Sequence, residues 1–301
     1  MKLIFKKLFN RYIRNNYNYP RNETQAILLG KILSKLNNEK KNLSSIAEAE
    51  FKVFSQWGDD GIIQYLINAI EMPKTFVEFG VQNYYEANTR FLLINDNWSG
   101  LIIDGSKENI ESVYQQDICW RFDLKAVEAF ITAENINNLI SSNGFSGEIG
   151  LLSVDIDGND YWVLKSIEVI SPVVIIVEYN STFGSERYIS IPYEPDFFRT
   201  KAHFSNLYWG ASLPAFCHLC NEKGYTLIGC NSNGNNAYFV RNDKIGSLPK
   251  PTIAEAFVNS KFRDSRGPSG AFTYLDKKQQ LEMIKGMKVV NVKTNDSESI
   301  F

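Results

Sequence analysis

Cysteine and long apolar runs are both scarce in this 301-residue chain. The four cysteines are too few for a disulfide scaffold in a chain of this length, which indicates a reducing compartment. No stretch approaches the roughly 18 apolar residues that a membrane-spanning helix needs, and the N-terminal apolar runs are too short for a signal peptide. We therefore expect a cytoplasmic protein.

Positive charge is not in excess either, because the formal net charge is -2 and the pI is near 5.9. Without a general basic field to hold phosphates, no nucleic acid partner is expected. Residues 1–21 are the exception, since they contain six Lys and Arg, no acid, and apolar residues at helical spacing. This segment is predicted to be a basic amphipathic helix that either contacts an anionic membrane surface peripherally or packs on the domain.

Short apolar runs alternate with helical patterns through the middle of the chain. Buried strands are expected at 76–79, 100–104, 151–155 and 173–178, with helices at 86–95, 127–143 and 161–170. A helix at 213–223 and a hairpin of 225–230 with 236–241 follow. Alternation of this kind predicts an α/β fold with a doubly wound, mostly parallel sheet.

The composition divides the chain into three parts. Residues 1–50 read as a basic helical extension, 51–245 as the α/β domain, and 246–301 as a C-terminal helical extension. Within the domain, the alternation stops at about 180–212, a segment rich in aromatic residues and arginine. Long irregular segments in compact domains are often binding loops, so we expect a lid there.

A candidate nucleotide cradle follows the first strand. Glu78 and Gly80 end that strand, and Asp104 ends the next one 24 residues after the glycine, where an acid can accept hydrogen bonds from ribose hydroxyls. A dinucleotide needs two further glycines for its pyrophosphate, but Gln82 and Tyr85 stand at those positions. The pattern therefore favours S-adenosylmethionine, which has no phosphate, over NAD. The alternative is a buried strand-helix-strand unit whose acids are only caps.

Two later acids fit the same crevice. Asp123 is expected at the end of the third strand, where it can accept from the adenine amino group, and Asp155 ends the fourth. Each signal is weak alone, because Asp at a strand end is also ordinary turn chemistry.

Four motifs together resemble the FkbM-type methyltransferases over roughly residues 51–241. They are Ser55-Gln56-x-Gly58-x-Asp60-Gly61, Val77-Glu78-Phe79-Gly80 with Asn88-Thr89, Trp98-x-Gly100-Leu101-x-Ile103-Asp104-Gly105, and Ser153-x-Asp155-Ile156-Asp157-Gly158-x-Asp160. The resemblance implies a class I methyltransferase fold of Rossmann-like type, S-adenosylmethionine as the methyl donor, and O-methylation of a sugar hydroxyl in a surface glycan or its precursor. The pair Gln82-Asn83 departs from the small residues common at that turn.

The resemblance also assigns roles to residues of this chain. It implies that Glu78 and Gly80 contact the methionine side of the cofactor, Asp104 the ribose and Asp123 the adenine end. The complete candidate cofactor set is Gln56, Asp60, Glu78, Gly80, Asn83, Asp104, Gly105, Asp123 and Asp155.

Methyl transfer to oxygen needs positioning and a base for the acceptor's proton. The candidate bases at the strand ends are Asp155, Asp157, Asp160 and Glu178, of which we favour Asp157 first and Glu178 second. His203 in the lid is the better of the two histidines for such a role. The run Asp155, Asp157 and Asp160 offers the hard oxygen ligands of a divalent metal, although no metal is the favoured prediction. The alternative role for Asp160 is a helix N-cap.

Two rival functions remain at this stage. A protein of the same fold that binds partners without catalysis would use the terminal extensions as its working surfaces, and a methyltransferase could act on a non-sugar acceptor. A nicotinamide-dependent enzyme is disfavoured by the missing glycines. The partner expected for the enzyme is a small-molecule or glycan acceptor, and the sequence does not indicate an oligomeric state.

Overall fold

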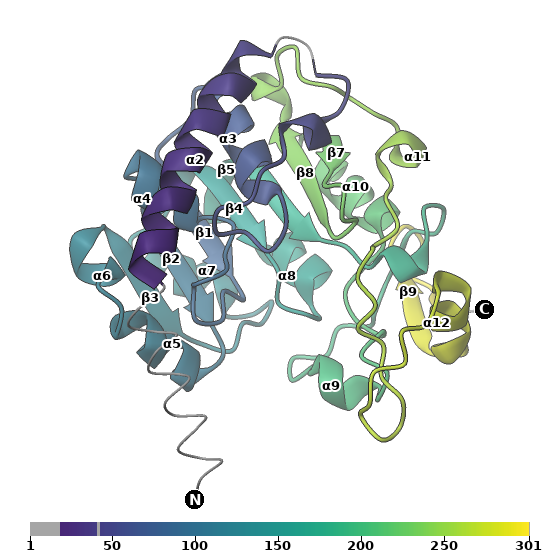
Figure 1. Ribbon diagram of the computed structural model, residues 1–301. Helices are drawn as coiled ribbons and strands as arrows, with labels where there is room; N and C mark the ends of the chain where they lie inside the picture. Colours follow the sequence, from purple (N-terminus) through teal and green to yellow (C-terminus); the bar gives the residue numbers. More distant parts are fainter. Residues whose placement is uncertain (1–18, 41–42, 301) are drawn as a thin grey trace, which may run out of the picture.

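A seven-stranded sheet forms the centre of the molecule in the computed structural model, which describes residues 19–40 and 43–300 (Figure 1). Its strand order is β3-β2-β1-β4-β5-β8-β7, with all neighbours parallel except those of β8. The strands are β1 (Thr75–Phe79), β2 (Ser99–Asp104), β3 (Leu124–Glu128), β4 (Gly147–Val154), β5 (Ile170–Glu178), β7 (Tyr225–Cys230) and β8 (Asn236–Arg241). The predicted fold class, an α/β fold with a doubly wound and mostly parallel sheet, is confirmed.

Helices cover both faces of this sheet and enclose two apolar cores. One face is covered by α7 (Ile136–Ser142), α8 (Asp160–Ser166) and α10 (Leu213–Glu222). The other is covered by α3 (Asp59–Ala69), α4 (Arg90–Asp96), α5 (Lys107–Tyr114) and α6 (Ile118–Arg121). Because strands β1, β2, β4 and β5 are buried on both sides, they are nearly continuous in apolar residues, which made them predictable.

The third strand was placed wrongly from the sequence. Asp123 precedes β3 rather than ending it, and its carbonyl accepts a hydrogen bond from the Gly100 backbone at the start of β2. The strand occupies the first residues of the helix expected at 127–143, and only Ile136–Ser142 are helical there. The physical reason is that β3 is the edge strand, so it alternates buried and exposed residues and lacks a continuous apolar run.

Other boundaries differ by a few residues. The helix expected at 86–95 starts at Arg90 because a loop of turns precedes it, and the helix expected at 161–170 ends at Ser166, where β5 soon begins.

The segment after residue 246 is mostly not helical, contrary to the expected helical extension. It contains the short helices α11 (Ile253–Ala256) and α12 (Lys277–Met283) and the strands β9 (Lys288–Asn291) and β10 (Ser297–Ser299). These strands pair with β6 (Ile189–Ser190) of the lid in a second sheet, of order β10-β9-β6. The lid also holds η3 (Ser181–Phe183) and α9 (Arg199–Ala202), and η4 (Asn242–Lys244) follows β8. We call residues 180–212 and 246–300 the cap, since they share one apolar core.

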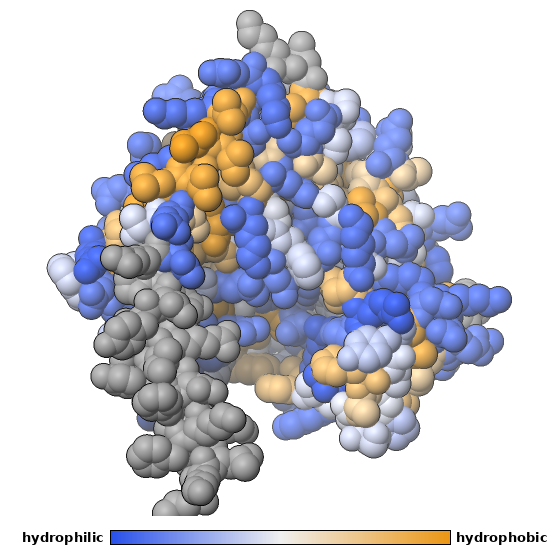
Figure 2. Space-filling view, in the orientation of Figure 1, coloured by the Kyte–Doolittle hydropathy of each residue, from blue (hydrophilic) through white to orange (hydrophobic). Residues whose placement is uncertain are grey.

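The long helix α2 (Tyr19–Glu39) lies outside α3 and α4, and η2 (Ile46–Ala49) joins it to the domain (Figure 1). An apolar patch on this side of the molecule coincides with α2 (Figure 2). No helix in the described part of the chain is both long and apolar enough to cross a membrane. The predicted basic helix at 1–21 falls almost wholly outside the described residues.

Candidate functional site

A cleft of about 430 Å³ opens at the carboxyl edge of the parallel strands, between the main sheet and the cap. This is the edge at which open α/β sheets bind ligands, and the volume is in the range of small-molecule pockets. From the sheet side it is lined by Gly80, Gln82, Ile103, Asp104, Gly105, Ser106, Asn109, Ala129, Phe130, Ile131, Asp155, Ile156, Asp157 and Asn159. From the cap it is lined by Phe197, Phe198, Arg199, Thr200, Asn206 and Asp264.

The turn after β1 brings its backbone close to the end of β4. Gly80 has a φ of +72°, and a Cβ built there would lie 1.6 Å from the carbonyl oxygen of Asp155. Its backbone N–H donates to the carbonyl of Ile103 in β2 at 2.9 Å. Gly80 thus fixes three strand ends against one another, which no residue with a side chain could do without moving β4.

We expect Gly80→Ala to destabilise the protein more than Gly184→Ala does. Both glycines have left-handed φ values, +72° and +78°, but nothing lies within 4 Å of a Cβ at Gly184. Gly184→Ala should lose only the stability cost of a backbone conformation that favours glycine, about 1–3 kcal/mol, while Gly80→Ala adds the overlap with the Asp155 carbonyl oxygen. Urea unfolding measures both. Equal losses in the two variants would mean that the turn after β1 can move away from β4.

Asp104 ends β2 with its carboxylate at the wall of the cleft. One oxygen accepts from the Gln82 backbone N–H at 2.7 Å, and the other accepts from the Ser106 backbone at 2.8 Å and from the Asn109 side chain at 3.0 Å. These donors fix the carboxylate while leaving it acceptor capacity, because two ionised oxygens offer about four lone-pair sites. The acid is therefore held ready to accept from ligand hydroxyls.

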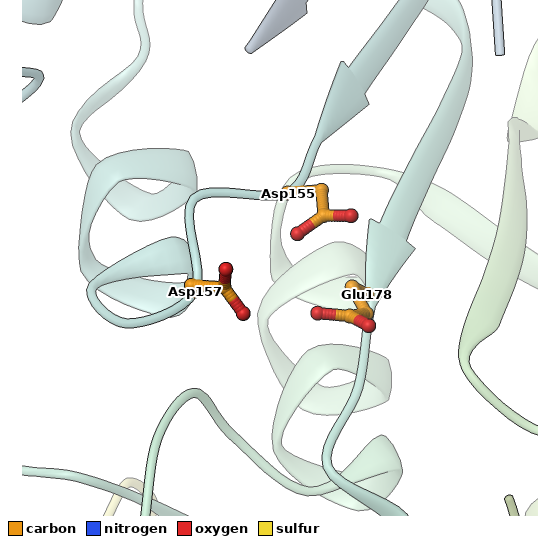
Figure 3. Close-up of side chains that lie close together, drawn as sticks. All are labelled: Asp155, Asp157 and Glu178. Atoms are coloured by element: carbon orange, nitrogen blue, oxygen red, sulfur yellow. The ribbon is translucent and has the colours of Figure 1, made fainter. Parts of the chain in front are cut away.

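Three carboxyl groups meet at the ends of β4 and β5 (Figure 3). Asp155 follows β4, Glu178 ends β5, and Asp157 lies in the loop before α8. Burial and the like charges of Asp157 and Asp160 raise the pKa of Asp155 well above its usual value. Burial and the neighbouring Asp155 raise the pKa of Glu178 in the same direction. Because burial and the repulsion between like charges raise both pKa values, the pair retains a proton to higher pH than isolated carboxyls do.

Arg199 of α9 brings the cap into contact with this acidic group. Its guanidinium is ion-paired with Asp157 and, at 2.8 Å, with Asp264. The group also donates to the carbonyl of Asn206 at 2.8 Å and lies 4.7 Å from the ring centre of Trp209. Arg199 therefore holds the sheet side of the cleft and the two segments of the cap in one arrangement.

The three acids that could bind a metal ion differ by one residue from the predicted set, because Glu178 takes the place of Asp160. Asp155, Asp157 and Glu178 have ligand oxygens within 4.8 Å of one another, so these three acids could hold a divalent cation. Asp160 is outside this group, because its carboxylate accepts from the backbone N–H groups of Ile156 and Gly158 at 2.7 and 2.8 Å. Burial raises its pKa to about 6. Asp160 thus holds the loop that leads into α8, a structural role similar to the helix N-cap that the sequence offered as the alternative.

Of the predicted cofactor residues, the structure brings Gly80, Asp104, Gly105 and Asp155 to the cleft. Gln56 and Asn83 are exposed and do not line it. Asp123 lies before β3, at the amino ends of the parallel strands and so at the end of the sheet away from the cleft. Its assignment to adenine is therefore wrong.

Two further predicted cofactor residues, Glu78 and Asp60, are buried and do not line the cleft. Glu78 accepts from the backbones of Asn88 and Thr89 at 2.8 and 3.0 Å, and burial raises its pKa to about 7. Asp60 accepts from three successive backbone N–H groups of residues 53–55. Both acids hold loops, and neither lines the cleft.

His203 does not line the cleft either. Its Nδ1 is 2.7 Å from Ser205 Oγ, and its ring centre lies 4.4 Å from that of Phe204. Burial lowers its pKa. A catalytic role for His203 therefore has no geometric support.

The sequence did not single out Phe130, Asn206 or Asp264 as site residues. Phe130 follows β3 at the cleft wall, and its ring is nearly parallel to that of Phe198, at 6.4 Å and 11°. The alternation Leu124-Lys125-Ala126-Val127-Glu128 was the available signal for an edge strand ending beside Phe130. Asp264 is far along the chain in an irregular stretch, where no local pattern marks it.

Solved structures similar to this chain are methyltransferases at low identity. A putative caffeoyl-CoA O-methyltransferase from Staphylococcus aureus is 14% identical, with a TM-score of 0.40 over 79% of this chain and 99% of its own. An O-methyltransferase from Bacillus cereus in complex with SAH is 12% identical, with a TM-score of 0.40 over 78% and 97%. The N-terminal domain of EvdMO1 with SAH bound is 12% identical, with a TM-score of 0.39 over 70% and 94%. No protein-family model and no curated protein matches the chain.

Proposed function

We propose that the protein is an S-adenosylmethionine-dependent methyltransferase that O-methylates a sugar hydroxyl of a glycan or glycan precursor. One observation carries the proposal: the cleft combines a single-glycine turn and the strand-end acid Asp104 with a proton-retaining pair, Asp155 and Glu178. The first two features suit a nucleoside without a pyrophosphate, and the third suits proton removal from an acceptor.

The residues of the cleft fit S-adenosylmethionine. Gly80 leaves the backbone of the turn bare, while the side chain at position 82 stands where a pyrophosphate would need glycine. Asp104 would accept from the ribose hydroxyls, and Phe130, next to the end of β3, would stack on the adenine ring in place of the expected Asp123. Bound there, the cofactor would supply an electrophilic methyl group on its sulfonium.

Asp155 is the proposed base. It lines the cleft, whereas Glu178 does not, and the Asp157 carboxylate is engaged in an ion pair with Arg199. The Asp155 carboxylate would accept the proton of the acceptor hydroxyl, whose oxygen would gain the methyl group in exchange. A raised pKa makes Asp155 a stronger proton acceptor than an isolated aspartate. This assignment replaces Asp157, the base favoured by the sequence alone.

The cap side of the cleft supports a sugar acceptor. Phe198 offers an apolar ring, and Asn206 and Asp264 offer hydrogen-bonding groups, a combination that matches the apolar face and hydroxyl edge of a pyranose. Arg199, although ion-paired, borders the same space and would favour an acceptor that carries a phosphate or carboxylate.

The test is a transfer assay with S-adenosylmethionine carrying a labelled methyl group. Acceptors would be hexoses, deoxyhexoses, nucleotide sugars, a catechol and a primary amine, each with and without a chelator. We expect label on a sugar oxygen, identified by mass spectrometry. Label only on the catechol or the amine would overturn the sugar assignment, and no transfer to any acceptor by protein that binds the cofactor would favour the non-catalytic rival. Loss with the chelator would assign a metal to the acidic group.

A further inference from the structure

Helix α2 has its apolar side turned away from the protein. Five large aliphatic residues on it are 41–60% exposed, and they recur at spacings of three or four residues. They are Leu28, Leu29, Ile32, Leu33 and Leu36, which we call the α2 stripe. Figure 2 shows the apolar patch that lies over this helix. A surface helix normally buries such a stripe against the core of the protein, whereas α2 exposes it to solvent.

The side of α2 that faces the protein has one large aliphatic residue, Ile27, which packs beside Phe51, Phe54 and Phe91, and its other buried residues are small or polar. Gly30 is buried where a Cβ would lie 2.6 Å from the side chain of Val53. Ser34 donates to Gln64 at 3.0 Å, and Asn37 donates to the carbonyl of Ala49 at 2.6 Å. These buried contacts fix the rotation of the helix about its axis, because turning the stripe inward would break the hydrogen bonds of Ser34 and Asn37. The exposure of the stripe is therefore built into the fold.

Charge indicates what covers this stripe. The first 41 residues contain ten Lys and Arg against two Glu, in a chain whose formal net charge is -2. Lys31 and Lys35 are exposed on α2 itself, among the residues of the stripe. A second copy docked stripe to stripe would place two strongly positive segments together, which is unfavourable. An anionic surface would instead attract the net positive charge of this part of the sequence.

We propose that α2 is a membrane-surface helix, with the stripe inserted among the acyl chains of an anionic bilayer and its lysines at the headgroups. Exposed aliphatic residues flanked by basic side chains are the pattern of helices that lie in the plane of the interface. The stripe extends the predicted membrane contact of residues 1–21 into the described structure. The inference does not depend on the cofactor or on the acceptor.

The experiment is co-sedimentation of the full-length chain with two kinds of vesicle, phosphatidylcholine alone and phosphatidylcholine mixed with phosphatidylglycerol. The chain should bind the mixed vesicles and should be released by salt. Leu29→Ser with Ile32→Ser should weaken binding at least about tenfold, since it removes apolar area from the interface. Leu281→Ser is the matched control, because Leu281 is an exposed leucine on α12, and it should bind as the original chain does.

Each other outcome overturns the proposal. Equal binding of the double variant would mean that the stripe does not enter the membrane. Absence of vesicle binding, with a dimer in light scattering that the double variant loses, would assign the stripe to a second copy. If neither vesicle binding nor a dimer is detected, the remaining explanation is that the chain's own N-terminal segment packs on the stripe. Thermal unfolding of the double variant should match that of the original chain, because both side chains are more than half exposed.

Discussion

Asparagine in place of Asp104 is expected to weaken S-adenosylmethionine binding by about 10–100-fold. The carboxylate would accept the ribose hydroxyls, and hydrogen bonds to a charged acceptor contribute about 1.5–3 kcal/mol each. The substituted amide would keep the size of the side chain but would turn an NH₂ group toward the backbone donors Gln82 and Ser106 or toward the cleft. Calorimetric titration of the variant with S-adenosylmethionine measures the change.

The matched control is Asp123→Asn, which changes the acid that the sequence alone assigned to adenine. Because Asp123 lies before β3 at the far edge of the sheet, this variant should bind the cofactor as the original chain does. Weakening by Asp123→Asn, with none by Asp104→Asn, would contradict the placement of the cofactor. Thermal unfolding of both variants separates loss of binding from loss of fold.

The second large effect is expected at Asp155. Asp155→Asn should lower kcat by about 10²–10⁴, the usual contribution of a positioned general base, while leaving cofactor binding within a few-fold. In the original enzyme the raised pKa of Asp155 means that the rate should climb as pH rises through that pKa and then level off. Steady-state rates at saturating acceptor, measured across pH, give both quantities.

Asp157→Asn distinguishes the two candidate bases. The negative charge of Asp157 helps to raise the pKa of Asp155, so its removal should lower that pKa and shift the rise in kcat to lower pH. Its plateau rate should stay far above that of Asp155→Asn. The opposite order, with Asp157→Asn the more damaging change, would return the role of base to Asp157.

The predictable part of the fold was the part determined by local burial. Strands β1, β2, β4 and β5 are apolar along their length because helices cover both of their faces. The edge strand β3 alternates instead, and the sequence pattern places the third strand too early, ending at Asp123. The cap could not be foreseen, because β9 meets β6 about 100 residues earlier in the chain. No periodicity of either segment alone indicates that pairing.

The candidate site divides in the same way between local pattern and tertiary packing. Asp104 and Asp155 were found because the carboxyl ends of parallel strands converge on one edge. Glu78 stands near the end of β1 and Asp60 at the start of α3, but both accept backbone hydrogen bonds and neither lines the cleft, which only the path of the loops decides. Arg199 and Asp264 reach the cleft through tertiary packing of the cap.

The most direct test of cofactor binding is calorimetric titration of the full-length chain with S-adenosylmethionine and, separately, with NAD. We predict saturable one-to-one binding of S-adenosylmethionine that Gly80 and Asp104 support, and none of NAD, since the turn lacks the glycines that a pyrophosphate needs. Binding of NAD without binding of S-adenosylmethionine, or no binding of either, would contradict the account.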